Sequence, residues 1–138
     1  METDNNKIII AQKAIIYDEN RNILTIQRSE NSPRPLTWDL PGGNLEFGEE
    51  LESSILREIE EETKIEVENL SLLSIFENLD SVDLFRVTIG YKTKAKNTNV
   101  ILSHEHIDFK WVTPEEFSKL DIYEPHRKLV EQFKKMRV

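Results

Sequence analysis

The chain has 138 residues, a length that suits one domain with a hydrophobic core of its own. Acidic residues outnumber basic ones and the formal net charge is -8, which argues against binding to a nucleic-acid duplex. Because there is no cysteine, disulfides, zinc–thiolate sites and cysteine nucleophiles are excluded. Residues 1–7 are polar and no apolar run reaches transmembrane length, so we expect a cytoplasmic protein without a signal peptide or membrane association.

The first third of the chain is predicted to form short extended segments separated by turns. β-Branched residues and alternation of apolar with polar side chains favour strands. Two prolines make residues 29–37 a loop, and Pro41-Gly42-Gly43 is a strong breaker of regular structure. We therefore expect strands over residues 8–17 and 23–28, paired as a hairpin, with short extended pieces over 38–40 and 44–47.

Residues 49–63 form the clearest predicted helix. Leu51, Ile55 and Ile59 recur every four residues, which predicts one apolar stripe facing the core. No Ser, Thr, Asp or Asn caps its start, but an acidic first turn complements the helix dipole.

After this helix, strands are predicted again. They cover residues 65–78, 83–93 and 109–112. Pro114 and Pro125 each open a further helix, the last one with Leu129, Phe133 and Met136 on one stripe. Strands on both sides of the central helix predict an α+β fold in which a mixed sheet packs between helices.

The central helix carries a pattern with chemical meaning. Glu58, Glu61 and Glu62 stand at positions i, i+3 and i+4 and share a face, where their like charges repel. A hard divalent cation such as Mg²⁺ takes oxygen ligands and would relieve that repulsion. Arg57, four residues before Glu61, can orient a carboxylate by paired hydrogen bonds. Glutamate runs also commonly mark solvent-exposed faces, so the composition alone leaves both interpretations open.

The spacing favours the metal site. Gly43 is followed after five residues by Glu49, after seven more by Arg57-Glu58-Ile59, and after one more by Glu61-Glu62. This resembles the box of the Nudix hydrolase family, and every fixed position matches except Lys64, which replaces the last box glycine. The segments 38–43 and 111–117, and Glu105 between them, also resemble the family. A non-glycine residue in a left-handed helix cap costs about 1 kcal/mol and affects the turn rather than the ligands.

The resemblance implies one Nudix domain over residues 1–138, with an α/β/α sandwich. It implies metal-dependent hydrolysis of a nucleoside diphosphate linked to a moiety X, with Mg²⁺, or alternatively Mn²⁺, as cofactor. The implied metal ligands are Glu58, Glu61, Glu62 and the carbonyl of Gly43. Glu58 is our first candidate for the general base, and Arg57 orients the site. Glu105 is the second candidate for base or ligand, with an ordinary surface glutamate as the alternative.

Substrate recognition is less specific in the sequence. We assign Arg28 to phosphate binding, with a surface ion pair as the alternative. Glu49 is grouped with the substrate-binding residues, where we expect it to orient the site rather than contact the substrate. Base stacking by an aromatic residue competes with burial in the core, and His104 and His106 are interpreted as surface residues. The aromatic candidates are Trp38, Phe76, Phe85 and Trp111.

A small-molecule nucleotide is the expected partner, and a homodimer is left open. The segment 79–82 lacks the proline that ADP-ribose-specific members carry after the box, so the resemblance favours a nucleoside triphosphate cleaved to monophosphate and pyrophosphate. The alternatives are ADP-ribose, nucleotide sugars, dinucleoside polyphosphates, a non-catalytic nucleotide sensor, or an acidic interaction protein without a small ligand.

Overall fold

A computed structural model describes residues 5–136 of the chain. Most of the polar segment 1–7, on which the prediction about targeting was based, lies outside this range. Among the described residues, no helix combines the length and apolar character needed to cross a membrane.

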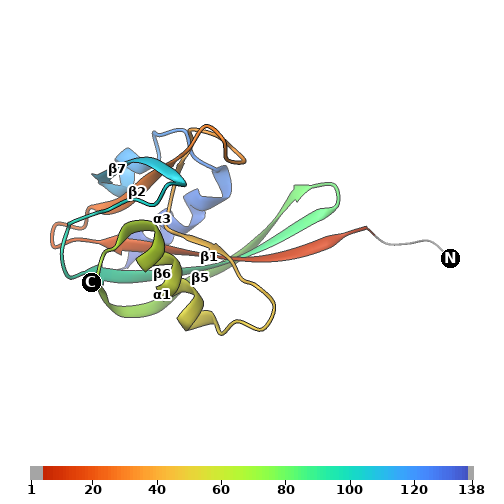
Figure 1. Cartoon of the computed structure of the whole chain (residues 1–138), viewed down its shortest axis with the longest axis horizontal. Coiled ribbons are helices and arrows are strands. Elements are labelled where there is room, and N and C mark those ends of the chain that lie inside the picture. Colours follow the sequence, from red (N-terminus) through yellow and green to blue (C-terminus); the bar gives the residue numbers. More distant parts are fainter. Residues whose placement is uncertain (1–4, 137–138) are drawn as a thin grey trace.

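A mixed sheet lies between α1 on one face and α3 on the other, as Figure 1 shows. This confirms the predicted α+β arrangement. The strands are β1 (Lys7–Tyr17), β2 (Ile23–Arg28), β3 (Trp38–Asp39), β4 (Gly42–Asn44), β5 (Val67–Ser81), β6 (Leu84–Ala95) and β7 (His106–Val112). The helices are α1 (Leu51–Thr63), α2 (Pro114–Phe117), the 3-10 turn η1 (Glu124–His126) and α3 (Arg127–Lys135).

Strand β1 serves two hydrophobic cores at once. Successive side chains of a strand point to opposite faces of a sheet. Ile15 therefore packs with Leu129 and Phe133 on the α3 side. Its neighbours Ala14 and Ile16 pack on the α1 side instead. A strand buried on both faces is apolar at consecutive positions, which explains the unbroken run in the sequence.

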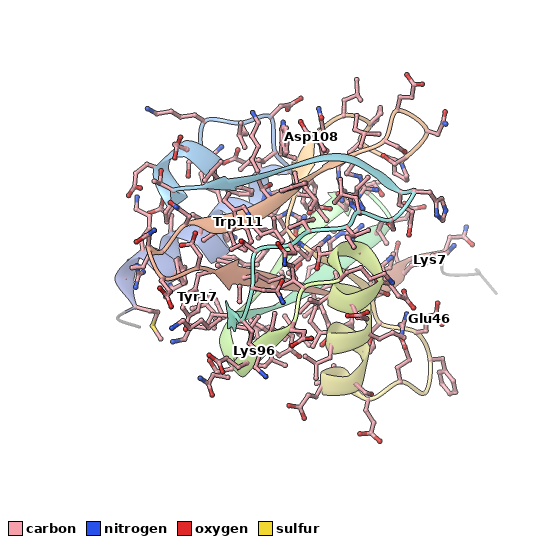
Figure 2. All side chains as sticks on the ribbon, turned by 60° about the vertical axis from the view of Figure 1, so that its left-hand side comes forward. Lys7, Tyr17, Glu46, Lys96, Asp108 and Trp111 are labelled. Atoms are coloured by element: carbon pink, nitrogen blue, oxygen red, sulfur yellow. The ribbon has the colours of Figure 1, made fainter. Side chains whose placement is uncertain are left out.

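The predicted hairpin of β1 and β2 exists only at its turn. Tyr17 pairs with Ile23, and the two strands then take different neighbours. β1 pairs in parallel with β6 and antiparallel with β4, whereas β2 pairs with β3 and β7. We call β4, β1, β6 and β5 the long leaf and β3, β2 and β7 the short leaf. Figure 2 shows Lys7 and Tyr17 at the two ends of β1, with Asp108 and Trp111 on β7 of the short leaf.

The glycine pair forms a strand instead of breaking one, so the extended piece predicted at 44–47 starts two residues earlier and ends three residues earlier. Gly42 lies opposite Lys13 of β1 with a φ of 141°. A Cβ at Gly42 would collide with the carbonyl oxygen of Gln12. The absence of a side chain therefore permits this close backbone approach.

Helix α1 begins two residues later than predicted, and Glu50 caps it without a side-chain hydrogen bond. Ile55 and Ile59 are fully buried as expected. Leu51 is 44% exposed, which corrects its place in the apolar stripe. The buried residues of α1 all follow Ser53, because only the later turns of the helix pack on the sheet.

The end of α1 is tied to the loop that precedes β7. Lys64 adopts the left-handed conformation predicted for the missing glycine, with a φ of 59°. The N–H of Ile101 donates to the carbonyl of Thr63 at 2.9 Å, and that of Ser103 donates to the carbonyl of Glu62 at 3.3 Å. These bonds satisfy carbonyl groups that a helix end leaves free.

The remaining boundaries differ modestly from prediction. Strand β5 starts at Val67, two residues later than predicted, and Ile65 before it is a buried core residue. α2 opens at Pro114 as predicted, behind a capping box formed by Thr113 and Glu116. Pro125 lies in η1 and α3 begins only at Arg127, while Met136 follows the helix as its cap and is 37% exposed, so the predicted apolar stripe stops at Phe133.

Replacing Lys64 with glycine tests the helix cap. Lys64→Gly should raise the free energy of unfolding by about 1 kcal/mol, because glycine adopts the left-handed conformation without a Cβ penalty. Urea titration measures this change. Lys64→Ala is the control, since it removes the lysine charge and keeps the strain. Equal stabilities of the glycine and alanine variants would contradict the interpretation.

Candidate active site

The Gly42–Gly43 backbone lies directly against helix α1. The N–H of Gly42 donates to Oε1 of Glu62 at 2.9 Å. A Cβ placed on Gly43 would lie only 3.0 Å from Oε2 of Glu58. The fold therefore brings together three of the four predicted metal-binding residues, although they come from different elements.

The two carboxylates in this contact are withdrawn from water. Glu62 is 7% exposed, and burial raises its pKa to about 8 despite the opposing charge of Lys13 and the Gly42 N–H. Burial likewise raises the pKa of Glu58, and the charges of Glu61 and Glu105 add to that effect. Charged carboxylates in such a setting are costly unless a cation compensates them.

Arg57 joins three glutamates of the predicted site. Its Nη1 lies 3.2 Å from both carboxylate oxygens of Glu61, so the predicted paired hydrogen bonds are present. Its Nη2 lies 2.7 Å from Oε2 of Glu49 and 3.4 Å from Oε1 of Glu58. The hydrogen bonds to Glu49 and Glu61 raise the pKa of Arg57.

Glu49 fixes the entry to the helix. Its Oε1 accepts from the N–H of Glu46 at 2.7 Å and from Oγ of Ser54 at 3.3 Å. The Glu46 N–H and then Arg57 lower the pKa of this carboxyl. Figure 2 shows Glu46 on the loop that leads into α1. Glu49 thus already has a partner on each oxygen, which suits an orienting role better than substrate contact.

Glu105 approaches the box from the loop before β7. It is exposed, its N–H donates to Oγ of Ser103 at 3.4 Å, and its carbonyl accepts from Ser29. Its charge contributes to the raised pKa of Glu58, so the loop holds it near the helix face. The adjacent His104 is exposed as predicted. His106 is half-buried, which corrects the surface interpretation, and burial lowers its pKa.

The donor atoms at this site fit a hard divalent cation. Carboxylates of Glu58, Glu61 and Glu62 and the backbone of Gly43 offer only oxygen ligands, as Mg²⁺ and Mn²⁺ prefer. Within residues 5–136, no three such side chains already converge as a finished metal cage. Glu61 is turned to Arg57, so it would have to exchange this partner to reach a metal ion.

A second set of charges lies between the two leaves of the sheet. We call it the Asp39 cluster, and it consists of Lys13, Arg28, Asp39 and His126. Oδ2 of Asp39 lies 3.0 Å from Nζ of Lys13 and 3.0 Å from Nη1 of Arg28. Lys13 also donates to the carbonyl of Leu40 at 3.1 Å. The cluster thereby fixes the chain just before the glycine pair.

Charge balance in the Asp39 cluster comes from Lys13 and Arg28. Burial alone would raise the pKa of Asp39, but these cations hold it well below its usual range. His126 lies 3.3 Å from Oδ1 without hydrogen-bond alignment. Burial lowers the pKa of His126 to about 3, so it is neutral near pH 7 and adds no charge.

Arg28 forms an ion pair, as the alternative interpretation expected, but the pair is partly buried, and the assignment of Arg28 to phosphate binding stays a prediction. Its side chain is 20% exposed and is engaged by Asp39 and by the carbonyl of Pro33. Sequence reasoning missed Lys13, Asp39 and His126. A lysine inside the β-branched run of β1 was the available signal, because a charge on a doubly buried strand needs a partner.

The predicted aromatic candidates are largely structural. Trp38 is 8% exposed and Phe76 is 7% exposed, so both belong to the core. Phe85 and Trp111 are half-buried. Trp111 packs against the core cluster on the α1 side.

A model of the NUDIX domain matches residues 8–133, which include every residue of this site. The chain belongs to the Nudix family. This confirms the resemblance seen in the box and the predicted Nudix-type sandwich, and it identifies the chain as a hydrolase acting on acid anhydrides. Nudix hydrolases generally use divalent metal ions.

Individual relatives agree with this assignment. A "MutT-like protein" of Streptomyces ambofaciens is 31% identical over 110 residues, covering 80% of this chain and 67% of that protein. "Nucleoside triphosphatase NudI" of Enterobacter sp. (strain 638) is 25% identical and covers 82% of this chain and 87% of its own length. The crystal structure of a MutT protein from Methanosarcina mazei Go1 superposes with a TM-score of 0.82 at 28% identity, covering 94% and 95% of the two chains.

Neutralising Asp39 tests the cluster between the leaves. Asp39→Asn should lower the free energy of unfolding by about 3 kcal/mol or more, because Lys13 and Arg28 lose their buried counter-charge. Chemical denaturation measures this loss. Asp108→Asn, at an exposed position of β7, should change stability by less than about 0.5 kcal/mol. A loss at Asp39 no larger than that at Asp108 would contradict a structural role.

The raised pKa of Glu62 predicts a pH dependence of stability. Between the ordinary value of 4.5 and about 8, the folded state holds a proton that the unfolded chain has lost. The free energy of unfolding of the metal-free Nudix protein should therefore fall as pH rises. His126 acts in the opposite direction below pH 6.5, so the test is cleanest from pH 6.5 to 8.

Glu62→Gln should remove most of this decline while keeping the acceptor for the Gly42 N–H. Denaturation in the presence of a chelator at several pH values provides the comparison. An equally steep decline in the variant would assign the effect to another group.

Proposed function

We propose that this Nudix hydrolase cleaves nucleoside triphosphates to monophosphate and pyrophosphate with Mg²⁺, or alternatively Mn²⁺. The observation that carries the proposal is the contact of Glu58 and Glu62 with Gly42–Gly43, in the register of a complete set of box glutamates. The Enterobacter relative named as a nucleoside triphosphatase supports the substrate class.

Different residues of the site would bind the cation and orient its ligands. Glu58, Glu61, Glu62 and the Gly43 carbonyl would hold the cation, which when bound neutralises phosphate charge and acidifies water. Arg57 keeps the glutamates in place through its bonds to Glu49 and Glu61. These carboxylates would otherwise repel the anionic substrate.

Hydrolysis also requires a proton acceptor. A water molecule gives one proton to a carboxylate while the water oxygen bonds to the α-phosphorus. The bond from the α-phosphorus to the bridging oxygen breaks, and pyrophosphate leaves with the electron pair of that bond. Glu58 remains the first candidate, because its raised pKa moves it toward the range in which a general base works near neutral pH. Glu105 is the second candidate, since its loop brings it near Glu58.

Single glutamine variants test the assigned glutamates. Glu58→Gln and Glu62→Gln should each reduce Mg²⁺-dependent turnover by about a hundredfold or more, because each removes a charge from the metal and base positions while keeping its shape. Glu60→Gln is the matched control on the same helix, since Glu60 is exposed and occupies a variable position of the box. Full activity of the Glu58 and Glu62 variants would make the assignment wrong.

A substrate panel tests the proposed reaction. The protein is assayed with Mg²⁺ and with Mn²⁺ against nucleoside triphosphates, ADP-ribose, nucleotide sugars and dinucleoside polyphosphates, and the products are identified. Monophosphate plus pyrophosphate from a triphosphate is the expected result. Inactivity on every triphosphate would overturn it, and binding without turnover on the whole panel would favour a nucleotide sensor.

A further inference from the structure

Five polar side chains meet beside the box and take no part in the chemistry described above. We call them the Tyr123 cluster, and they are Arg34, Asn78, Asp80, Arg86 and Tyr123. Arg86 connects them to the active site, because its Nη1 lies 3.3 Å from Oδ1 of Asn44, the residue that follows Gly43. The cluster therefore contacts the residue next to Gly43, whose carbonyl is a predicted metal ligand.

The ring of Tyr123 is held in a fixed position. Its hydroxyl accepts from Nδ2 of Asn78 at 2.8 Å and donates to Oδ1 of Asp80 at 2.6 Å. The N–H of Trp38 donates to the carbonyl of Asp121 at 2.8 Å and secures the segment that carries the ring. The ring of His126 also meets the Tyr123 ring nearly perpendicularly, with 5.1 Å between centroids, and the guanidinium carbon of Arg86 lies 5.9 Å from the Tyr123 centroid.

One face of this ring is covered by Arg34. The guanidinium carbon lies 3.9 Å from the ring centroid, as in a cation–π contact. Arg34 comes from the loop 29–37, where Arg34 and Leu36 both have positive φ values of 55° and 63°. Left-handed backbone is unfavourable for residues with a Cβ, so the loop conformation depends on contacts of this kind. The cover is thus a side chain on a strained surface loop.

Hydrogen bonding in the cluster is incomplete. Nε of Arg34, Nε of Arg86 and Oδ1 of Asn78 are buried and have no partner in the structure. Buried polar groups in proteins are normally paired. The two arginines and the one aspartate also give the cluster a net charge of +1. A ligand with hydrogen-bonding groups and a negatively charged extension would complement both features.

We propose that the face of Tyr123 now covered by Arg34 is the platform on which the base of the nucleotide stacks. This inference rests on the proposed triphosphate function. A planar guanidinium and a planar base use an aromatic face in the same way, so Arg34 occupies the place that the base would take. From there Arg86 and Asn44 lead toward Gly43, which lets the phosphates extend to the box glutamates.

A binding experiment separates the base from the phosphates. Calorimetry with Mg²⁺ compares α,β-imido nucleoside triphosphates with inorganic tripolyphosphate, which has the phosphates and no base. Tyr123→Ala should weaken binding of the nucleoside triphosphates by about five- to a hundredfold and leave tripolyphosphate unchanged. Tyr123→Phe keeps the ring and should retain most of the affinity.

Two variants serve as controls for packing. Tyr17→Ala removes a tyrosine that packs on Phe133. Arg21→Ala removes an arginine whose guanidinium carbon lies 4.5 Å from the centroid of the Phe133 ring, and Arg21, like Arg34, has a positive φ. Neither should change the preference for nucleoside triphosphate over tripolyphosphate. Thermal unfolding verifies that each variant is folded.

Several outcomes would overturn the proposal. In Tyr123→Ala, the affinities for nucleoside triphosphate and tripolyphosphate could fall equally, or neither could fall. The unmodified protein could also bind both ligands equally well, or bind no nucleoside triphosphate at all. The test reads binding rather than turnover. A base-dependent affinity without hydrolysis would therefore sustain the platform and refute the proposed reaction, and hydrolysis without base dependence would do the reverse.

Discussion

The site depends on the contact between helix α1 and the Gly42–Gly43 backbone. A Cβ at Gly43 would press on the carboxylate of Glu58 at 3.0 Å, and the Gly42 N–H reaches a carboxylate two turns from where α1 enters the core. This contact needs β4 to pair with β1, which in turn needs β1 and β2 to separate after their turn. The box is one motif in sequence, but its two ends become a site only through that sheet geometry.

Electrostatics explains why the neighbouring charges are arranged as they are. Several glutamates lie on one helix, and burial raises the pKa of two of them, Glu58 and Glu62. Lys13 lies between this face and Asp39, so one buried cation moderates both groups. Arg57 does the same at the exposed side of the helix. The protein therefore holds a dense carboxylate face with internal cations, and a divalent metal ion would complete the compensation.

Periodicity and spacing predicted most elements and the box register. They failed where tertiary contacts decide the outcome. Leu51 continues the helical repeat but lies beyond the sheet, and the glycine pair becomes a strand because β1 lies against it. The Asp39 cluster combines residues from β1, β2, β3 and η1, and no local sequence pattern predicts that these four residues come into contact. Tyr123 could not be singled out from the sequence, because its contacts are with Asp80 and Arg34, which are distant in sequence.

The most direct test of a metal-dependent carboxylate face is the free energy of unfolding as a function of Mg²⁺ concentration at pH 7.5 and constant ionic strength. A ligand that binds only the folded state stabilises it by about 1.4 kcal/mol per tenfold increase above its dissociation constant. We expect such a rise for the unmodified protein and a nearly flat response for a variant that lacks the Glu62 charge. A flat response in both, or an equal rise in both, would contradict it.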